Sequence, residues 1–336
     1  MGLLADSLNR SQPSATIAVS TKARQLKAAG RDVISRAAGE PDFDTPANIK
    51  AAAVAAMEAG KTRYTDVDGI PELKAAIIRK FARENGLEFK PSEISVGTGG
   101  KQVIYNALLA TLNAGDEVVI PAPCWVSYAD IVMLPDGKPV FPETRMEDDY
   151  KLKPEVLESA ITPKTKWLIF NSPSNPTGSA YSQDEMKALT DVLLRHEHVW
   201  IMSDDIYEHL IYDGHTFCTP AAVEPRLKDR TLTINGLSKA YCMTGWRLGY
   251  AGGPETLLSA LRKLQSQSTS NPCSTTQWPA SEAPDGPPHF IADHNPTSVA
   301  RPPLVPSMPH PTLGRPATTP TGPIPVRPPL RAPPPH

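Results

Sequence analysis

Lys239 has the surroundings in this sequence that most favour covalent chemistry. It directly follows the apolar run RTLTINGLS at 230–238, which is typical of a buried parallel strand that ends in small and polar residues. Open α/β sheets bind their ligands at the carboxyl ends of such strands. A lysine shielded from water there has a lowered pKa, so that its amine can attack a carbonyl carbon and later move protons. Spacing alone leaves open that Lys239 is an ordinary solvated charge.

Polar groups also follow two other predicted strands. Asp204 and Tyr207 stand in SDDIYEHL, and Asn175 stands in NSPSNPTG. An aspartate at a strand-to-helix junction often serves only as a helix N-cap. The NP and TG pairs around Asn175 are ordinary turn formers. Structural and functional roles therefore both remain open for these residues.

The segment GTGGKQ at 97–102 has the composition of an anion-binding turn. It places Gly99, Gly100 and Lys101 between a predicted strand and a predicted helix, where consecutive backbone amides can receive a phosphate dianion. Arg247, in TGWRLGYAGG, offers a planar fork to the same anion. A tight strand-to-helix turn without a ligand is the simpler alternative.

The elements that must position these residues alternate between strand and helix. This pattern predicts an α/β fold with a mostly parallel sheet flanked by helices. Strands are expected at 93–100, 116–123, 166–173, 199–205 and 230–238, and helices at 50–60, 69–86, 101–112, 186–197 and 254–270.

The composition favours small-molecule chemistry. The 336 residues include 34 basic and 36 acidic ones, a formal net charge of -2 that does not suggest a nucleic-acid partner. The four cysteines form no CxxC pair, so neither a disulfide framework nor a metal site is expected. No secretory signal and no apolar stretch of membrane-spanning length is seen, so we expect no membrane partner and a cytoplasmic location.

The segment NGLSKAYCMTGWRLGY at 235–250 closely resembles the lysine-attachment motif of class I aminotransferases, which are pyridoxal-phosphate enzymes of fold type I. Further matches follow in family order from roughly residue 12 to 295. They are similar to the subgroup of bacterial aspartate aminotransferases, some of which also transaminate prephenate. The resemblance implies ping-pong transfer of an amino group between an amino acid, with aspartate expected, and a 2-oxo acid through a Schiff base on Lys239.

The resemblance also implies a role for each matching residue. Asp204 would pair with the ring nitrogen of pyridoxal 5′-phosphate, and a buried carboxylate there keeps that nitrogen protonated and the ring an electron sink. Asn175 and Tyr207 would bind the phenolic oxygen, and Trp125 would stack on the ring. The phosphate would be held by Gly99, Gly100, Lys101, Ser238 and Arg247. Gly39, Trp125 and Asn175 would contact the substrate. Tyr64 would reach the phosphate bound by a neighbouring subunit, which implies a homodimer.

The domain organisation departs from the family after residue 295. We expect an N-terminal arm and small-domain segment at 1–45, a pyridoxal-phosphate-binding large domain at 46–295, and a disordered proline-rich tail at 296–336. Relatives continue into a small C-terminal domain whose arginine holds the α-carboxylate of the substrate, and nothing here matches it. The small domain is therefore expected to be incomplete and turnover impaired. Pro279 and Pro284 are expected to break the helix that the family has there.

The sequence also fits several alternative functions. Gln12 replaces a lysine that many relatives with dicarboxylic substrates carry, which weakens the expectation of aspartate. Another fold type I reaction, such as carbon–sulfur β-elimination, would use the same lysine. The chain could also be a catalytically impaired cofactor-binding remnant of a damaged gene, or a generic Rossmann-like binding protein.

Overall fold

A seven-stranded sheet forms the centre of the molecule in the computed structural model, which describes residues 3–35, 39–212, 214–286 and 290. Its strand order is β1-β7-β6-β5-β4-β2-β3. The strands are β1 (Ile94–Gly97), β2 (Glu117–Val119), β3 (Lys138–Val140), β4 (Thr165–Asn171), β5 (Trp200–Asp204), β6 (Thr231–Gly236) and β7 (Gly249–Gly252).

The sheet is mostly parallel, as the sequence predicts. Strands β3, β2, β4, β5 and β6 run parallel to their neighbours, whereas β7 runs antiparallel to both β6 and β1. Strand β7 was not expected from the sequence because it contains glycines at both ends, and glycine is depleted in strands. Small residues are needed there, since a Cβ on Gly252 would lie 2.5 Å from the ring of Phe89.

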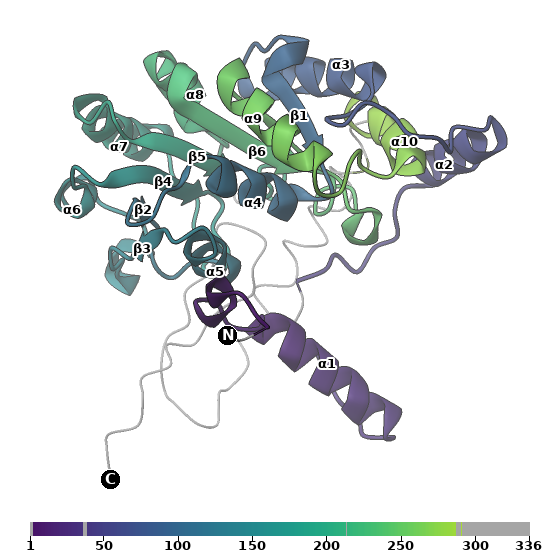
Figure 1. Cartoon of the computed structure of the whole chain (residues 1–336), viewed down its shortest axis with the longest axis horizontal. Coiled ribbons are helices and arrows are strands. Elements are labelled where there is room, and N and C mark those ends of the chain that lie inside the picture. Colours follow the sequence, from purple (N-terminus) through teal and green to yellow (C-terminus); the bar gives the residue numbers. More distant parts are fainter. Residues whose placement is uncertain (1–2, 36–38, 213, 287–289, 291–336) are drawn as a thin grey trace.

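Helices cover both faces of the sheet (Figure 1). Helices α4, α5 and α9 share one apolar core with the sheet, whereas α6 and α7 share another. The helices are α1 (Ala15–Ala28), α2 (Ala47–Glu58), α3 (Pro71–Lys80), α4 (Gly100–Thr111), α5 (Ser127–Met133), α6 (Pro154–Ala160), α7 (Gln183–Arg195), α8 (Pro220–Val223), α9 (Glu255–Ser266) and α10 (Ser274–Asp285). Short helical turns lie at Asp6–Asn9, Phe81–Asn85, Pro91–Glu93, Met146–Asp148, Pro225–Arg230 and Thr244–Trp246.

The expectation that Pro279 and Pro284 break a helix is wrong, because both lie inside α10. Tertiary contacts hold this helix against α2 and α3. Gln277 is fully buried, and its side chain accepts a 2.8 Å hydrogen bond from the Ile70 amide while donating to the Pro272 carbonyl at 2.8 Å. Ala280 is fully buried one turn later. Packing along this face offsets the backbone bonds that the prolines forfeit.

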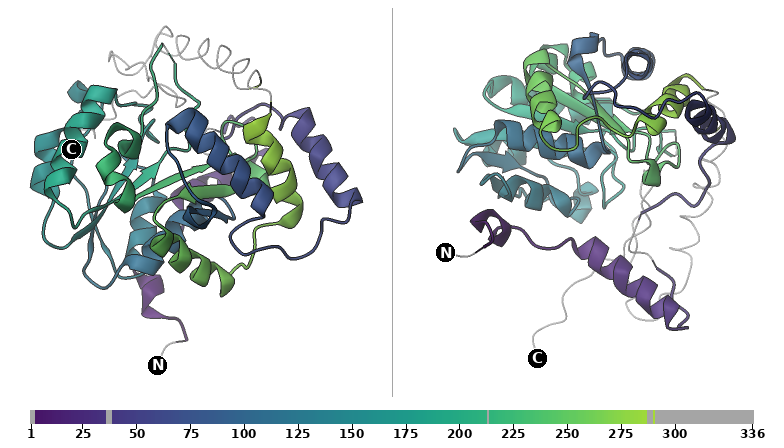
Figure 2. Two further views of the ribbon diagram at one scale, coloured as in Figure 1. Left: turned by 90° about the horizontal axis from the view of Figure 1, so that it is seen from above. Right: turned by 45° about the vertical axis from the view of Figure 1, so that its right-hand side comes forward.

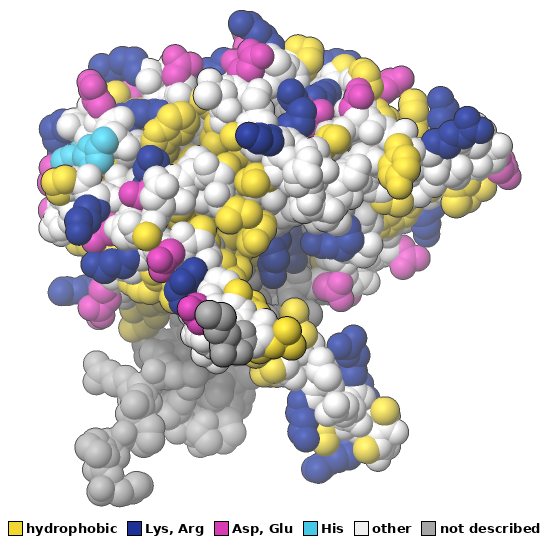
Figure 3. Space-filling model, viewed as in Figure 1, with side chains coloured by type: hydrophobic (Ala, Val, Ile, Leu, Met, Phe, Trp, Pro, Cys, Tyr) yellow, Lys and Arg dark blue, Asp and Glu magenta, His cyan; other side chains and the backbone are white. Residues whose placement is uncertain are grey.

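Helix α1 projects from the rest of the molecule (Figure 2, right). Only Ala23 of this helix is buried, whereas Ile17 and Val19 are 61% and 57% exposed. Figure 3 shows both hydrophobic and basic side chains on the protruding part. The start of the arm is fastened to α5, since Arg10 donates from Nε and Nη2 to the carbonyls of Met133 and Leu134, both at 3.0 Å.

Two expectations from the sequence concern parts or properties that the structure leaves untested. The proline-rich segment 296–336 lies outside the described residues. Among the described helices, none has the length and apolar character needed to cross a membrane. The cytoplasmic location stays a prediction.

Candidate active site

The carboxyl ends of β4, β5 and β6 meet at one edge of the sheet, as expected for parallel neighbours. Asn171 ends β4 and Asp204 ends β5, and these two residues are paired in the register of the strands. The Asn171 side chain donates a 2.7 Å hydrogen bond to the Asp204 carbonyl and accepts one of the same length from the Asn175 amide. The strand ends thus bring Asn175 and Asp204, predicted to act together, to the same place.

Asp204 is a buried carboxyl group with a hydroxyl partner. Its Oδ2 accepts a 2.6 Å hydrogen bond from the hydroxyl of Tyr128. Burial raises the pKa of Asp204, and this is opposed by the hydrogen bonds from Tyr128 and from the Ile206 amide and by the charge of Lys239. The carboxyl group is therefore costly to ionise unless a positive charge is brought to it.

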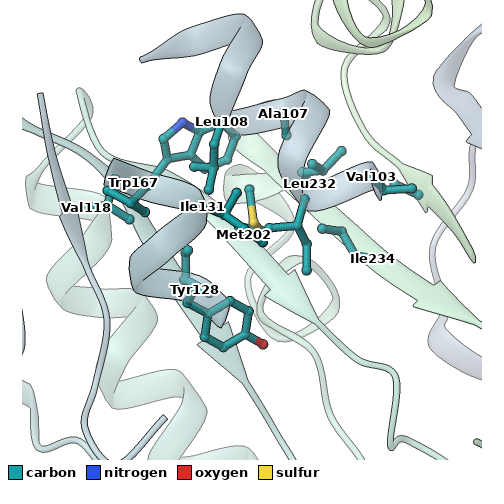
Figure 4. Close-up of a cluster of buried hydrophobic side chains, with 14 of the residues drawn as sticks. Val103, Ala107, Leu108, Val118, Tyr128, Ile131, Trp167, Met202, Leu232 and Ile234 are labelled. Carbon is teal, nitrogen blue, oxygen red and sulfur yellow. The ribbon is translucent and has the colours of Figure 1, made fainter. Parts of the chain in front are cut away.

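Sequence reasoning missed Tyr128. Its ring packs in the apolar core, and its hydroxyl points away from the labelled core side chains (Figure 4). A usable signal was the spacing from Trp125, because residues three apart at a helix start lie on the same side. The two rings are in fact T-shaped, with centroids 5.2 Å apart.

Tyr207 lies on the turn after β5. Its side chain is hydrogen-bonded to Asn175. Burial raises the pKa of Tyr207, and the nearby Asp204 carboxylate raises it further. The phenol therefore keeps its proton at neutral pH and can donate it in a hydrogen bond.

Lys239 lies on the loop after β6, with its amine directed to this site. Its Nζ lies 5.8 Å from the centroid of the Tyr207 ring and donates a 2.5 Å hydrogen bond to the carbonyl of Gly39. Burial lowers the pKa of Lys239, and Arg247 lowers it further, whereas the carboxylates of Glu40 and Asp204 oppose both effects. The structure thus brings together Lys239, Asp204, Tyr207, Asn175 and Gly39, which were predicted from distant segments.

In the predicted anion-binding turn, the backbone of Gly99 lies very close to the guanidinium group of Arg247. Gly99 has φ +86°, and a Cβ there would lie 2.4 Å from Nη2 of Arg247. A Cβ on Gly249, in β7, would lie 2.1 Å from the amide nitrogen of Gly100. Arg247 itself has φ 55° and donates from Nη1 to the Thr244 carbonyl at 2.9 Å, which helps to hold its fork beside the turn.

The first amides of α4 complete this turn. Gly100 and Lys101 begin the helix, where backbone N–H groups have no partner within the helix and carry partial positive charge. Burial lowers the pKa of Lys101, and the positive charge of the nearby Arg247 lowers it further. Nζ of Lys101 also lies 4.7 Å from the centroid of the Trp125 ring, so Trp125 borders the turn.

The two remaining predicted residues lie in different settings. Ser238 precedes Lys239 and is half-buried, with its carbonyl accepting from the Met243 amide at 3.2 Å. Tyr64 is 91% exposed on the surface, so its side chain is available to a neighbouring molecule.

Comparison with known proteins places these features in a family. The family model described as aminotransferase class I and II matches residues 31–301. An aspartate/prephenate aminotransferase from Cereibacter sphaeroides is 63% identical over 308 residues, which are 92% of this chain and 77% of that protein. The solved aspartate aminotransferase from Rhizobium meliloti superimposes with a TM-score of 0.92 at 48% identity, covering 96% of this chain and 80% of that one. The enzyme from Thermus thermophilus, solved with maleate, gives a TM-score of 0.90 at 41% identity and covers 96% and 84% of the two chains.

Proposed function

Because this chain belongs to the class I and II aminotransferase family, whose members use pyridoxal 5′-phosphate, we propose that it takes the amino group from aspartate, with Lys239 as the covalent residue. The chain is an aminotransferase that acts on amino acid and 2-oxo acid substrates. We further propose a role for each residue of the site and a homodimeric assembly.

The donor set of the site fits the cofactor. A phosphate dianion matches the turn at Gly99 and Gly100, where a Cβ on Gly99 would meet Arg247 at 2.4 Å and where the charge of Arg247 acts on Lys101. A protonated ring nitrogen would supply the positive charge that the buried Asp204 lacks. The phenol of Tyr207 and the amide of Asn175 are suited to a phenolic oxygen, and the amine of Lys239 to an aldehyde carbon.

When bound, the cofactor supplies an electron sink for the negative charge that develops when the α-carbon of an amino acid loses its proton. The lowered pKa of Lys239 increases the fraction of neutral amine, which is the form that attacks a carbonyl carbon and accepts a proton. Lys239 would carry the α-proton after an amino acid had replaced it at the cofactor. Asp204 would pair with the protonated ring nitrogen, and Trp125, which borders the glycine turn, would contact the ring.

Lys239 carries this proposal most directly, because its Nζ lies 5.8 Å from the Tyr207 ring and is close enough to Asp204 to feel its charge. Aspartate is proposed as donor because the relatives from Cereibacter sphaeroides and Rhizobium meliloti carry aspartate in their names. Prephenate is proposed as an amino acceptor because the names of several relatives, among them those from Cereibacter sphaeroides and Rhizobium leguminosarum, include it.

A homodimer is the proposed assembly. Tyr64 is 91% exposed, and Ile17 and Val19 on the projecting helix α1 are more than half exposed. A second copy of the chain would cover these apolar side chains and would receive the Tyr64 hydroxyl at its phosphate site.

The test is an absorbance titration of the purified chain with pyridoxal phosphate, followed by aspartate. A near-visible band that Lys239→Ala abolishes, and that aspartate shifts, is the expected result. A lysine-dependent band that ignores aspartate would leave a cofactor binder without the proposed donor. Assays for oxaloacetate against pyruvate and ammonia then separate amino transfer from carbon–sulfur β-elimination.

A further inference from the structure

Tyr207 stands on a turn that is anchored from behind by buried charged groups. The Glu208 amide donates a 2.9 Å hydrogen bond to the Asp205 carbonyl, so that Ile206 and Tyr207 are the central residues of the turn. Both flanking side chains are buried, with Asp205 1% and Glu208 6% exposed. We propose that Lys80, Asn85 and Glu208 form a clamp that positions the Tyr207 phenol at the cofactor. This inference rests on the function proposed above.

The clamp is closed by three side chains that bind one another. Nζ of Lys80 donates to Oε1 of Glu208 and, at 2.8 Å, to Oδ1 of Asn85. Nδ2 of Asn85 donates to Oε2 of Glu208 at 2.6 Å. Each member therefore contacts the other two, and both oxygens of the Glu208 carboxylate are held.

A local irregularity in the chain brings Lys80 and Asn85 together. Helix α3 ends at Lys80 and continues as a π-helical turn, Phe81–Asn85, which Gly86 terminates with φ 65°. Turns of this type are rare and occur frequently at functional sites. The wider turn lets side chains five residues apart meet, which fixes two members of the clamp relative to the third.

The charges of the clamp are balanced locally. Glu84, Glu208 and His209 have ligand atoms within 4.8 Å of one another, an arrangement that elsewhere could hold a metal ion. Here Nζ of Lys80 supplies the positive charge, since it binds Glu208 and lies 3.7 Å from Oε2 of Glu84. A buried ion pair contributes little stability beyond that of an apolar pair, but it permits only a narrow range of geometries. The pair of Lys80 and Glu208 therefore fixes the orientation of the turn that carries Tyr207.

The role of the clamp can be measured through the cofactor spectrum. A phenol that donates to the phenolic oxygen of the cofactor withdraws electron density and lowers the proton affinity of the adjoining nitrogen. Tyr207→Phe should therefore raise the pH midpoint of the lysine-dependent absorption band, by about one unit for a tenfold change in proton affinity. Loosening the clamp should move the midpoint the same way by a smaller amount.

The experiment compares Glu208→Gln, Lys80→Met and the double variant, in the full chain loaded with pyridoxal phosphate. Direct electrostatics predicts opposite shifts, because removing a negative charge lowers the midpoint and removing a positive charge raises it. The clamp predicts an upward shift, roughly two- to fivefold in proton affinity, for both single variants. The double variant leaves no unpaired buried charge within the clamp, so it keeps the test open if a single variant does not fold.

Glu117→Gln is the matched control, because Glu117 is a buried carboxylate paired with Lys138 at the amino end of β2, away from the site. It should lower the unfolding temperature without moving the midpoint. In a Tyr207→Phe background the clamp variants should add no further shift. The clamp would be ruled out if Glu208→Gln and Lys80→Met shifted the pH midpoint in opposite directions. It would also be ruled out if they caused the same shift in the Tyr207→Phe background as in wild type. If wild type shows no lysine-dependent band, the proposed function itself fails instead.

Discussion

The hydroxyl of Tyr128 donates a 2.6 Å hydrogen bond to Oδ2 of Asp204, and both side chains are buried. This bond lowers the pKa of the Asp204 carboxyl group, against the larger effect of burial. Tyr128 thus favours the ionised form of Asp204, which is the form that the proposed pairing with a protonated ring nitrogen requires.

Tyr128→Phe should slow the half-reaction with aspartate by about ten- to a hundredfold, since a hydrogen bond to a charged group is worth about 1.5–3 kcal/mol. The pKa of Asp204 would rise further, so that the defect should be larger at lower pH. Stopped-flow absorbance at several pH values measures this. Tyr181→Phe is the control, because Tyr181 is also buried but accepts from the Leu152 amide at 2.5 Å. Equal losses in the two variants would count against a specific role of Tyr128.

Gly99→Ala should weaken binding of the cofactor phosphate, because the new Cβ would displace Arg247 and the backbone at φ +86° is unfavourable for alanine. Such a backbone costs on the order of 1–3 kcal/mol. Gly60→Ala separates the two effects, since Gly60 has φ +71° but nothing within 4 Å of a Cβ. Cofactor titration by fluorescence should show weaker binding for Gly99→Ala and unchanged binding for Gly60→Ala.

Asp205→Asn should change how stability depends on pH. Burial raises the pKa of Asp205 to about 7 from an ordinary 3.8, and Glu208 adds to this. Between these values the unfolded chain has released the proton that the folded chain retains, so the free energy of unfolding falls as pH rises, by up to about 1.4 kcal/mol per unit. Urea unfolding from pH 4.5 to 7.5 should show a shallower decline in the variant. Parallel curves would mean that Asp205 does not titrate in this range.

Mixing two defective variants tests the homodimer. Tyr64→Phe should weaken cofactor binding in both sites, and Lys239→Ala should abolish the covalent step in both. A hybrid of the two chains has one intact site, if Tyr64 serves the neighbouring subunit. Activity should therefore return on mixing, towards a quarter of wild type for random pairing of equal amounts. Absence of recovery from chains that sediment as dimers would place Tyr64 elsewhere.

The sequence predicted the site best where reactive residues directly follow parallel strands. Asp204 and Lys239 follow apolar runs, and parallel strands must deliver their carboxyl ends to the same edge, so their meeting could be anticipated. The glycine turn before α4 could be placed for the same reason. The hydrogen-bond partners of Asp204 and Lys239 could not be predicted, because they depend on side-chain packing, which the hydrophobic periodicity of the sequence does not encode.

Tyr128 and α10 illustrate the two ways in which local rules fell short. Tyr128 looks like a core aromatic in the sequence because its ring does pack in the core. Only the fold shows that its hydroxyl donates to Asp204. The prolines of α10 break a local rule that Gln277 and Ala280 override through contacts with distant segments. Tertiary packing decides both cases.

The position of β7 between β6 and β1 has a consequence for biosynthesis. Strand β1 ends at Gly97, yet its partner in the sheet is completed only at Gly252. During translation β1 stays unpaired while more than half of the described chain is synthesised. Strands that are so far apart in the sequence also pair slowly. The turn at Gly99 and Gly100, which packs on Gly249, can be finished only then. The nascent chain therefore completes the turn that is proposed to bind phosphate late, after the strands that carry Asn171 and Asp204 have left the ribosome.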